Sequence, residues 1–137
     1  MNATILALMG YIGLILVLLI VMVSYRTSLI QKKVKLPNSF STDAAGEPAF
    51  GLRINRTHAN AIEGFSFIGG LMLLALATDS TAITDGLAFW MLGARLGQSV
   101  THLASTSVMA VQIRFVFFLL QVAIAIYWLS MFAVKFI

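Results

Sequence analysis

Long apolar stretches separated by short polar connections constrain the fold of this 137-residue chain more than any other feature. Hydrophobic residues make up 60% of the sequence and charged residues 10%, less than half of the about 25% that is typical of soluble domains. The mean hydropathy is +0.96. Because a helix needs about 20 mainly apolar residues to cross a bilayer, the sequence predicts an all-α integral membrane protein with one domain, residues 1–137.

Four stretches have the length and composition expected of transmembrane helices, at residues 4–25, 56–77, 86–108 and 111–134. The first stretch ends at Tyr25 and Arg26, an aromatic and basic pair typical of the membrane interface. It is longer than a signal-peptide core, so we expect it to be retained as a span. Residues 26–55 form the only long polar connection. The sequence therefore predicts a four-transmembrane-helix bundle.

The distribution of charge predicts the orientation of this bundle. Most of the cations lie in the first connection, namely Arg26, Lys32, Lys33, Lys35, Arg53 and Arg56. By the positive-inside rule, the first connection is then cytoplasmic and both termini are outside. Cations gathered beside spans are a topology signal, so no nucleic-acid partner is expected. From the small size and simple architecture we expect a location in the bacterial inner membrane.

Three polar stripes interrupt the apolar stretches, and all three fall near the predicted cytoplasmic end. Helical spacing puts the members of each stripe on one face: Arg56, Asn60 and Glu63 in the second stretch; Arg95, Ser99, His102 and Thr106 in the third; Arg114 and Gln121 in the fourth. Ionisable groups inside a membrane are costly and usually face a partner or a water-filled cavity. The convergence of the stripes predicts a polar site.

Structural explanations remain open for these residues. Glu63 could pair with Arg95 or Arg114 inside the bundle, since buried charges must be paired in any case. His102 could serve as a hydrogen-bonding residue between helices. With no cysteine and two histidines in the whole sequence, no metal site is predicted. An ion channel is disfavoured because one polar cluster at one end provides no path across the bilayer.

The residue types indicate the chemistry of a ligand. Arginine forks grip carboxylates, a glutamate can accept an ammonium group, and an asparagine can read a peptide amide. The stripes therefore suit a small zwitterion or polyanion that carries carboxylates. An apolar wall in the fourth stretch would accommodate a hydrophobic co-substrate, and it comprises Phe115, Phe117, Phe118 and Leu119.

The pattern Arg56-x-His58-x-Asn60-x-x-Glu63, with four predicted spans and a basic first connection, resembles the MAPEG superfamily, the membrane-associated proteins in eicosanoid and glutathione metabolism. The resemblance extends over nearly the whole chain. It is supported by Arg95 and by the Ile113-Arg114 pair. It implies a homotrimer of four-helix subunits with glutathione, as co-substrate, held between neighbouring subunits.

The resemblance also implies roles for individual residues. Asn60 and Glu63 would contact glutathione, Arg56 would brace it, and Arg114 would stabilise its thiolate as the catalytic residue. We assign three more residues to glutathione binding, namely Arg95, Gln98 and His102. The implied function is a glutathione-dependent membrane transferase or peroxidase that acts on hydrophobic electrophiles or lipid hydroperoxides.

A second class of function stays open. Enzymes of the family often carry an arginine directly before the asparagine, where this chain has Ala59, and a tyrosine in the third span, where this chain has none. These departures favour a non-catalytic relative that binds a lipid or a partner membrane protein. Such a scaffold would show no dependence on glutathione.

Overall fold

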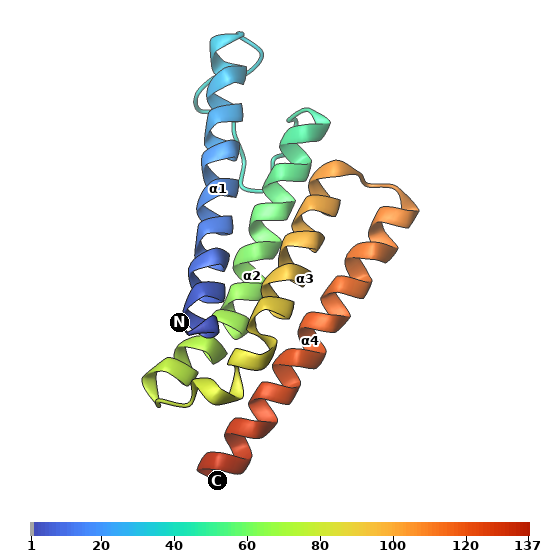
Figure 1. Cartoon of the computed structure of the whole chain (residues 1–137). Coiled ribbons are helices and arrows are strands. Elements are labelled where there is room, and N and C mark those ends of the chain that lie inside the picture. The colour runs from blue at the N-terminus through green and yellow to red at the C-terminus, as the bar shows by residue number, and fades with distance from the viewer. Residues whose placement is uncertain (1) are drawn as a thin grey trace.

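The computed structural model describes residues 2–137, and over this range the chain forms four long helices and one short 3₁₀ helix. The elements are α1 (Ala3–Gln31), α2 (Ala49–Ala77), η1 (Thr81–Ile83), α3 (Asp85–Ala104) and α4 (Val108–Phe136). The helices alternate in direction, so the beginning of α1 and the end of α4 lie at the same end of the bundle (Figure 1). The prediction of an all-α, four-helix fold is confirmed.

Three of these helices, α1, α2 and α4, are long and apolar enough to cross a membrane, and each has 29 residues. The shorter α3 has 20 residues and is not among them. Its low hydropathy comes from its polar residues, four of which are buried inside the bundle, namely Arg95, Gln98, Ser99 and His102. The chain is thus a multi-pass membrane protein, and the crossing of α3 stays a prediction.

The helices α1 and α2 extend further than their apolar stretches. The first predicted span ends at residue 25 and the second begins at residue 56, whereas the helix α1 continues to Gln31 and the helix α2 already begins at Ala49. Hydropathy marks the part of a helix that can lie in hydrocarbon, whereas the backbone can remain helical beyond it in water. The connection is therefore residues 32–48, and the cations Arg26, Arg53 and Arg56 belong to helices.

The turn between α3 and α4 also lies earlier than predicted. The sequence predicts a third span that runs to residue 108, but α3 ends at Ala104. The Ser107 hydroxyl accepts a hydrogen bond from the Ala110 N–H at 3.2 Å and caps the start of α4. A serine at this position is a common helix start signal, so the sequence contained the information for this boundary.

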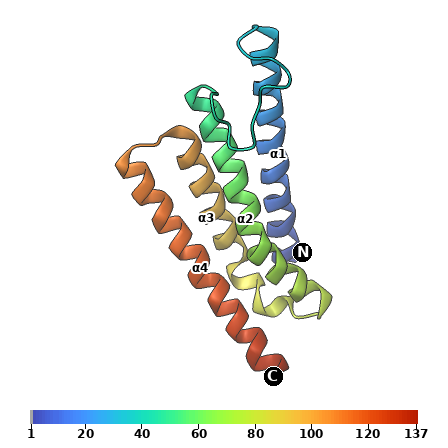
Figure 2. The same ribbon diagram turned by 180° about the vertical axis from the view of Figure 1, so that it is seen from behind.

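The connection 32–48 folds back between the ends of α1 and α2 (Figure 2). The Arg26 side chain anchors it, because its Nη2 lies 2.9 Å from Oε1 of the buried Glu47 carboxylate and its guanidinium lies over the Phe40 ring. Within the connection, hydrogen bonds from the Ser41 hydroxyl and the Ala45 N–H lower the pKa of the Asp43 carboxyl. The connection is thus an ordered cap on this end.

Hydrogen bonds close the opposite end of the bundle. Thr4 of α1 is fully buried, and its hydroxyl lies 2.6 Å from the Thr84 hydroxyl and donates to Asp85 Oδ1 at 2.7 Å. Near the end of α4, the Lys135 ammonium donates to the Ser80 hydroxyl at 2.6 Å. These bonds fix the starts of α1 and α3 and the end of α4 relative to one another.

The apolar core lies between these two ends. It is built from small and large side chains of all four helices, with Trp128 of α4 and Met72 of α2 among the fully buried ones. The helix α4 packs mainly against α3, has fewer contacts with α2, and is tilted against α1 (Figure 1). The lighter packing between α2 and α4 leaves room for cavities along these two helices.

Candidate functional site

A cavity of about 450 Å³ lies where the three polar stripes meet. Its lining comes from α2, α3, the following turn and α4, and comprises Arg56, Ala59, Asn60, Glu63, His102, Thr106, Val111 and Arg114. The antiparallel course of the helices explains the convergence, since α2 and α4 begin at this end and α3 ends there. Five of the seven residues assigned to the site from the sequence therefore line one space, namely Arg56, Asn60, Glu63, His102 and Arg114.

The cavity carries more positive than negative charge. The guanidinium groups of Arg56 and Arg114 line it together with a single carboxylate, Glu63. The Nε atom of Arg114 is buried and has no hydrogen-bond partner within residues 2–137. A buried charged donor without a partner is costly in a membrane bundle and calls for an explanation. The arrangement suits a ligand that brings at least one anionic group.

The predicted site residue Arg95 lies behind the cavity and does not line it. Its side chain is 1% exposed, and its Nη1 donates to Asn60 Oδ1 at 2.7 Å and to the Asn60 carbonyl oxygen at 3.4 Å. Its guanidinium also lies 5.4 Å from the centre of the Tyr11 ring. Because the Asn60 oxygen is taken by Arg95, its amide Nδ2 remains available as a donor to a ligand. Arg95 therefore positions Asn60.

Gln98 also lies away from the cavity. It is buried, and its Oε1 accepts a hydrogen bond of 2.8 Å from Gln121 Nε2 on α4. This pair links α3 to α4 in the interior of the bundle. Gln98 therefore serves as an interhelical contact, and Gln121, which shares a stripe with Arg114, forms the other half of that contact.

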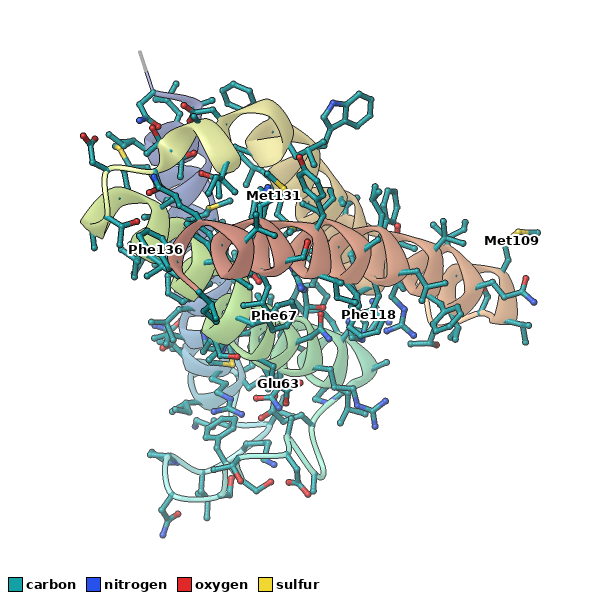
Figure 3. All side chains as sticks on the ribbon, turned by 90° about the horizontal axis from the view of Figure 1, so that it is seen from below. Glu63, Phe67, Met109, Phe118, Met131 and Phe136 are labelled. Carbon is teal, nitrogen blue, oxygen red and sulfur yellow. The ribbon has the colours of Figure 1, made fainter. Side chains whose placement is uncertain are left out.

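The structure shows whether Glu63 pairs with an arginine inside the bundle. Within residues 2–137 the only ion pair joins Arg26 and Glu47, and Glu63 pairs with neither Arg95 nor Arg114. Glu63 is exposed on α2 (Figure 3). The structural interpretation of Glu63 as an internal counter-ion is wrong. Its carboxylate is free for a ligand or a neighbouring molecule.

An apolar groove of about 300 Å³ continues the same α2–α4 seam deeper into the apolar part of the bundle. Phe67 and Phe118 lie between the two helices (Figure 3), one helical turn beyond Glu63 and Arg114. The rest of the lining is also apolar and comprises Leu71, Val122, Ala125, Ile126 and Leu129.

Of the apolar wall predicted from the sequence, only Phe118 lines this groove. Phe117 instead packs over Gly97 of α3, so closely that a side chain at Gly97 would meet its ring at 2.6 Å. Phe115 and Leu119 are exposed and do not line the groove. A run of apolar residues in a helix covers all faces, and the bundle decides which of them faces the groove.

Sequence reasoning missed Tyr11 of α1. It is fully buried, and its hydroxyl donates to the Ala61 carbonyl oxygen at 2.7 Å while its ring faces the Arg95 guanidinium. The sequence contained a signal for it, because Tyr11 is the only aromatic residue of the first apolar stretch before the interface pair Tyr25 and Arg26. A buried tyrosine usually needs a hydrogen-bond partner, and here that partner is α2.

The fold and the cavity together define a helical, multi-pass membrane protein with a charged cavity near one end and an apolar groove next to it. A scan against protein-family models matches the MAPEG family over residues 5–134. The chain therefore belongs to the MAPEG family, as the sequence resemblance predicts. A search of curated proteins and a search of solved structures returned no match.

Proposed function

We propose that this protein is a glutathione-dependent transferase or peroxidase of the membrane. The observation that carries the proposal is the single cavity lined by Arg56, Asn60, Glu63, His102 and Arg114. Its volume of about 450 Å³ falls within the range of about 300–1,000 Å³ usual for small-molecule sites. Membership of the MAPEG family supports the same class of function.

The charges in the cavity complement those of glutathione. Glutathione carries carboxylates, an ammonium group, peptide amides and a thiol. Arg56 provides a fork for a carboxylate, Glu63 an acceptor for the ammonium, and Asn60 an amide donor for a peptide carbonyl. Arg114 is left for the thiol. This division of roles uses Arg56, Asn60 and Glu63 of the family pattern, while His58 does not line the cavity.

Arg114 would make the thiol reactive. A thiol with a pKa near 8.5 is only slightly ionised at neutral pH, and an adjacent cation favours the nucleophilic thiolate. In a transferase reaction the thiol proton leaves to water, and the sulfur forms a bond to an electrophilic carbon while the bond from that carbon to a leaving group such as halide breaks, so that the leaving group departs as an anion. In a peroxidase reaction two glutathione molecules reduce a hydroperoxide to an alcohol and water and are oxidised to the disulfide.

The second substrate would be hydrophobic. The groove that contains Phe67 and Phe118 starts one turn from Glu63 and Arg114 and faces the apolar part of the bundle. An apolar molecule held in this groove could present a reactive group to the cavity. The groove thus supports hydrophobic electrophiles or lipid hydroperoxides as the substrate class.

The assembly and orientation are part of the same proposal. We propose a homotrimer with glutathione between subunits, inserted in the bacterial inner membrane with the connection 32–48 in the cytoplasm and both termini outside. The exposed carboxylate of Glu63 supports a site that is shared with a neighbour, since no cationic group within residues 2–137 forms an ion pair with it. Native mass spectrometry in detergent measures the subunit number.

A non-catalytic scaffold is the second candidate. The specific observation is that Ala59 lines the cavity at the position where catalytic relatives often have an arginine. The buried residues of α3 also include no tyrosine. Under this alternative the cavity and groove would hold a lipid or a segment of a partner protein, without any role for glutathione.

The thermal unfolding of the purified protein tests glutathione binding. A ligand at about one hundred times its dissociation constant stabilises a protein by about 2.7 kcal/mol, so millimolar glutathione is expected to raise the midpoint of the parent protein. Glu63→Ala is expected to bind glutathione at least about tenfold more weakly, because it removes a charge-assisted bond.

The matched control is Asp79→Ala, which removes an exposed carboxylate at the opposite end of the bundle. This variant is expected to respond to glutathione as the parent does. If neither the parent nor Asp79→Ala is stabilised, the scaffold replaces the enzyme as the better explanation. If glutathione raises the unfolding midpoint of Glu63→Ala as much as that of the parent, Glu63 does not contribute to glutathione binding.

A further inference from the structure

A second cavity, of about 240 Å³, lies beside the first at the same end of the bundle. It is lined by the start of α2 and the end of α3, and comprises Ala49, Leu52, Arg53, Arg56, His102 and Thr106. Three of these residues, Arg56, His102 and Thr106, also line the larger cavity and separate the two spaces. The volume is several times the about 30 Å³ that one water molecule occupies in the liquid.

All charged groups in this lining are cationic. The guanidinium groups of Arg53 and Arg56 come from successive turns of α2, and no carboxylate lines the space. Arg53 is held in place because its Nε donates to the Leu103 carbonyl oxygen at 2.8 Å. That bond covers one of the exposed carbonyls at the end of α3, which would otherwise repel an anion. The remaining guanidinium nitrogens of Arg53 form no hydrogen bond within residues 2–137.

His102 provides an independent observation that points to a ligand. The side chain is 9% exposed, lines both cavities, and forms no hydrogen bond in the described part of the chain. A nearly buried imidazole that has no partner leaves a ring nitrogen available for a bound molecule. The Thr106 hydroxyl, which also forms no hydrogen bond within residues 2–137, adds another donor to the lining.

The start of α2 adds a favourable dipole. The helix begins at Ala49 after Pro48, and no side chain caps its first N–H groups. These N–H groups form the positive end of the helix dipole, and Ala49 itself lines the cavity. An oxyanion at this point would interact with the helix end and with two arginine forks at the same time.

We propose that this second cavity is a binding site for a phosphate group, either of a phospholipid headgroup or of a free phosphate ester. Phosphate is favoured because its oxygens can accept from both guanidinium groups and from the Thr106 hydroxyl together. The location at the start of α2, before the apolar part of that helix, lies within reach of a lipid headgroup. Arg56 lines both cavities, so phosphate and the proposed glutathione would share its guanidinium, whereas Arg53 lines this second cavity and not the first.

Inorganic phosphate is the first probe. In a neutral detergent and at matched ionic strength, phosphate is expected to raise the unfolding midpoint of the parent protein relative to chloride. Arg53→Gln is expected to raise the phosphate concentration needed for half of this shift at least about tenfold, because one charge-assisted contact is lost. Lys32→Gln is the matched control, since it removes an exposed cation outside the cavity and should respond as the parent does.

Two further probes distinguish the sources of the phosphate. Glycerol phosphate and short-chain phosphatidylglycerol in the same detergent are compared on the parent and on Arg53→Gln. A lipid headgroup site is expected to respond to the lipid at an at least about tenfold lower concentration than to glycerol phosphate. Equal responses identify a site for a free phosphate ester. Both results support a phosphate site, provided that Arg53→Gln weakens the response.

Three results would overturn the proposal. The first is the absence of any phosphate effect beyond chloride on the parent. The second is an equal phosphate response of Arg53→Gln and the parent. The third is full competition between phosphate and glutathione, with Arg53→Gln weakening both to the same extent, which would make this cavity a part of the glutathione site. If phosphate raises the unfolding midpoint and glutathione does not, the phosphate site is supported and the proposed enzyme function is not.

Discussion

Arg114→Ala is expected to lower kcat for glutathione conjugation by about a hundredfold to a thousandfold, the loss typical for removal of one preorganised group that stabilises an anion. Arg114 lines the cavity, and its buried Nε has no partner in the described part of the chain. Its cation would stabilise the thiolate more than the thiol, so its removal raises the pKa of the bound thiol. The loss should therefore appear in kcat rather than in glutathione binding.

The measurement is the pH dependence of kcat, together with the ultraviolet absorbance of the thiolate in the glutathione complex. In Arg114→Ala the apparent pKa of the bound thiol is expected to rise to about 8.5, the usual value for a thiol. The rate lost near neutral pH should then be partly recovered at alkaline pH. Arg114→Lys keeps the charge but loses the fork, and is expected to fall between the parent and Arg114→Ala.

The matched control for Arg114 is Gln112→Ala. Gln112 is an exposed polar residue in the first turns of α4 and does not line the cavity. This variant is expected to retain the activity and the pH profile of the parent. An Arg114→Ala protein with the parent's kcat and pH profile would show that the thiolate is stabilised by another group.

Gly64→Ala is expected to destabilise the protein by about 1–3 kcal/mol, the usual cost of inserting an atom into a packed interior. A side chain at Gly64 would overlap Arg95 Nη2 and would lie 2.7 Å from the Tyr11 hydroxyl oxygen. Neither partner can move freely, because Arg95 is bonded to Asn60 and Tyr11 is bonded to Ala61. The strain is transmitted to Asn60, which lines the cavity.

Two readouts test this substitution, namely the free energy of unfolding in detergent and the dissociation constant for glutathione. Both are expected to worsen in Gly64→Ala. Gly70→Ala on the same helix is the matched control, because no atom lies within 4 Å of its added methyl group. It is expected to be neutral or to stabilise by about 0.5–1 kcal/mol through the backbone. Equal behaviour of the two variants would contradict the close contact between Arg95 and α2.

The helices, the polar stripes and the family could be predicted from the amino-acid sequence. The apolar stretches require membrane helices, and the spacing of Arg56, Asn60 and Glu63 requires that they share a face of one of them. Alternation of helix direction then brings the stripes to the same end. These properties follow from local periodicity and from the membrane as solvent, so they need no knowledge of the tertiary contacts.

The end of the first helix could not be predicted from local periodicity. Hydropathy predicted that the first helix ends near residue 25, but α1 continues to Gln31 because the connection 32–48 packs back onto it through Arg26, Glu47 and Phe40. Contacts between residues far apart in sequence stabilise this extension, and periodicity does not report such contacts.

Only the tertiary structure decided which residue of each stripe reaches the cavity. Arg95 and His102 lie on one face of α3, yet His102 lines the cavity while Arg95 is buried between Tyr11 and Asn60. Gln98 is buried against Gln121 in the same way. Helical spacing fixes the face on which a side chain lies, but the depth at which neighbouring helices cover that face depends on their tilt and on small residues such as Gly64. That packing separates residues that bind from residues that position them.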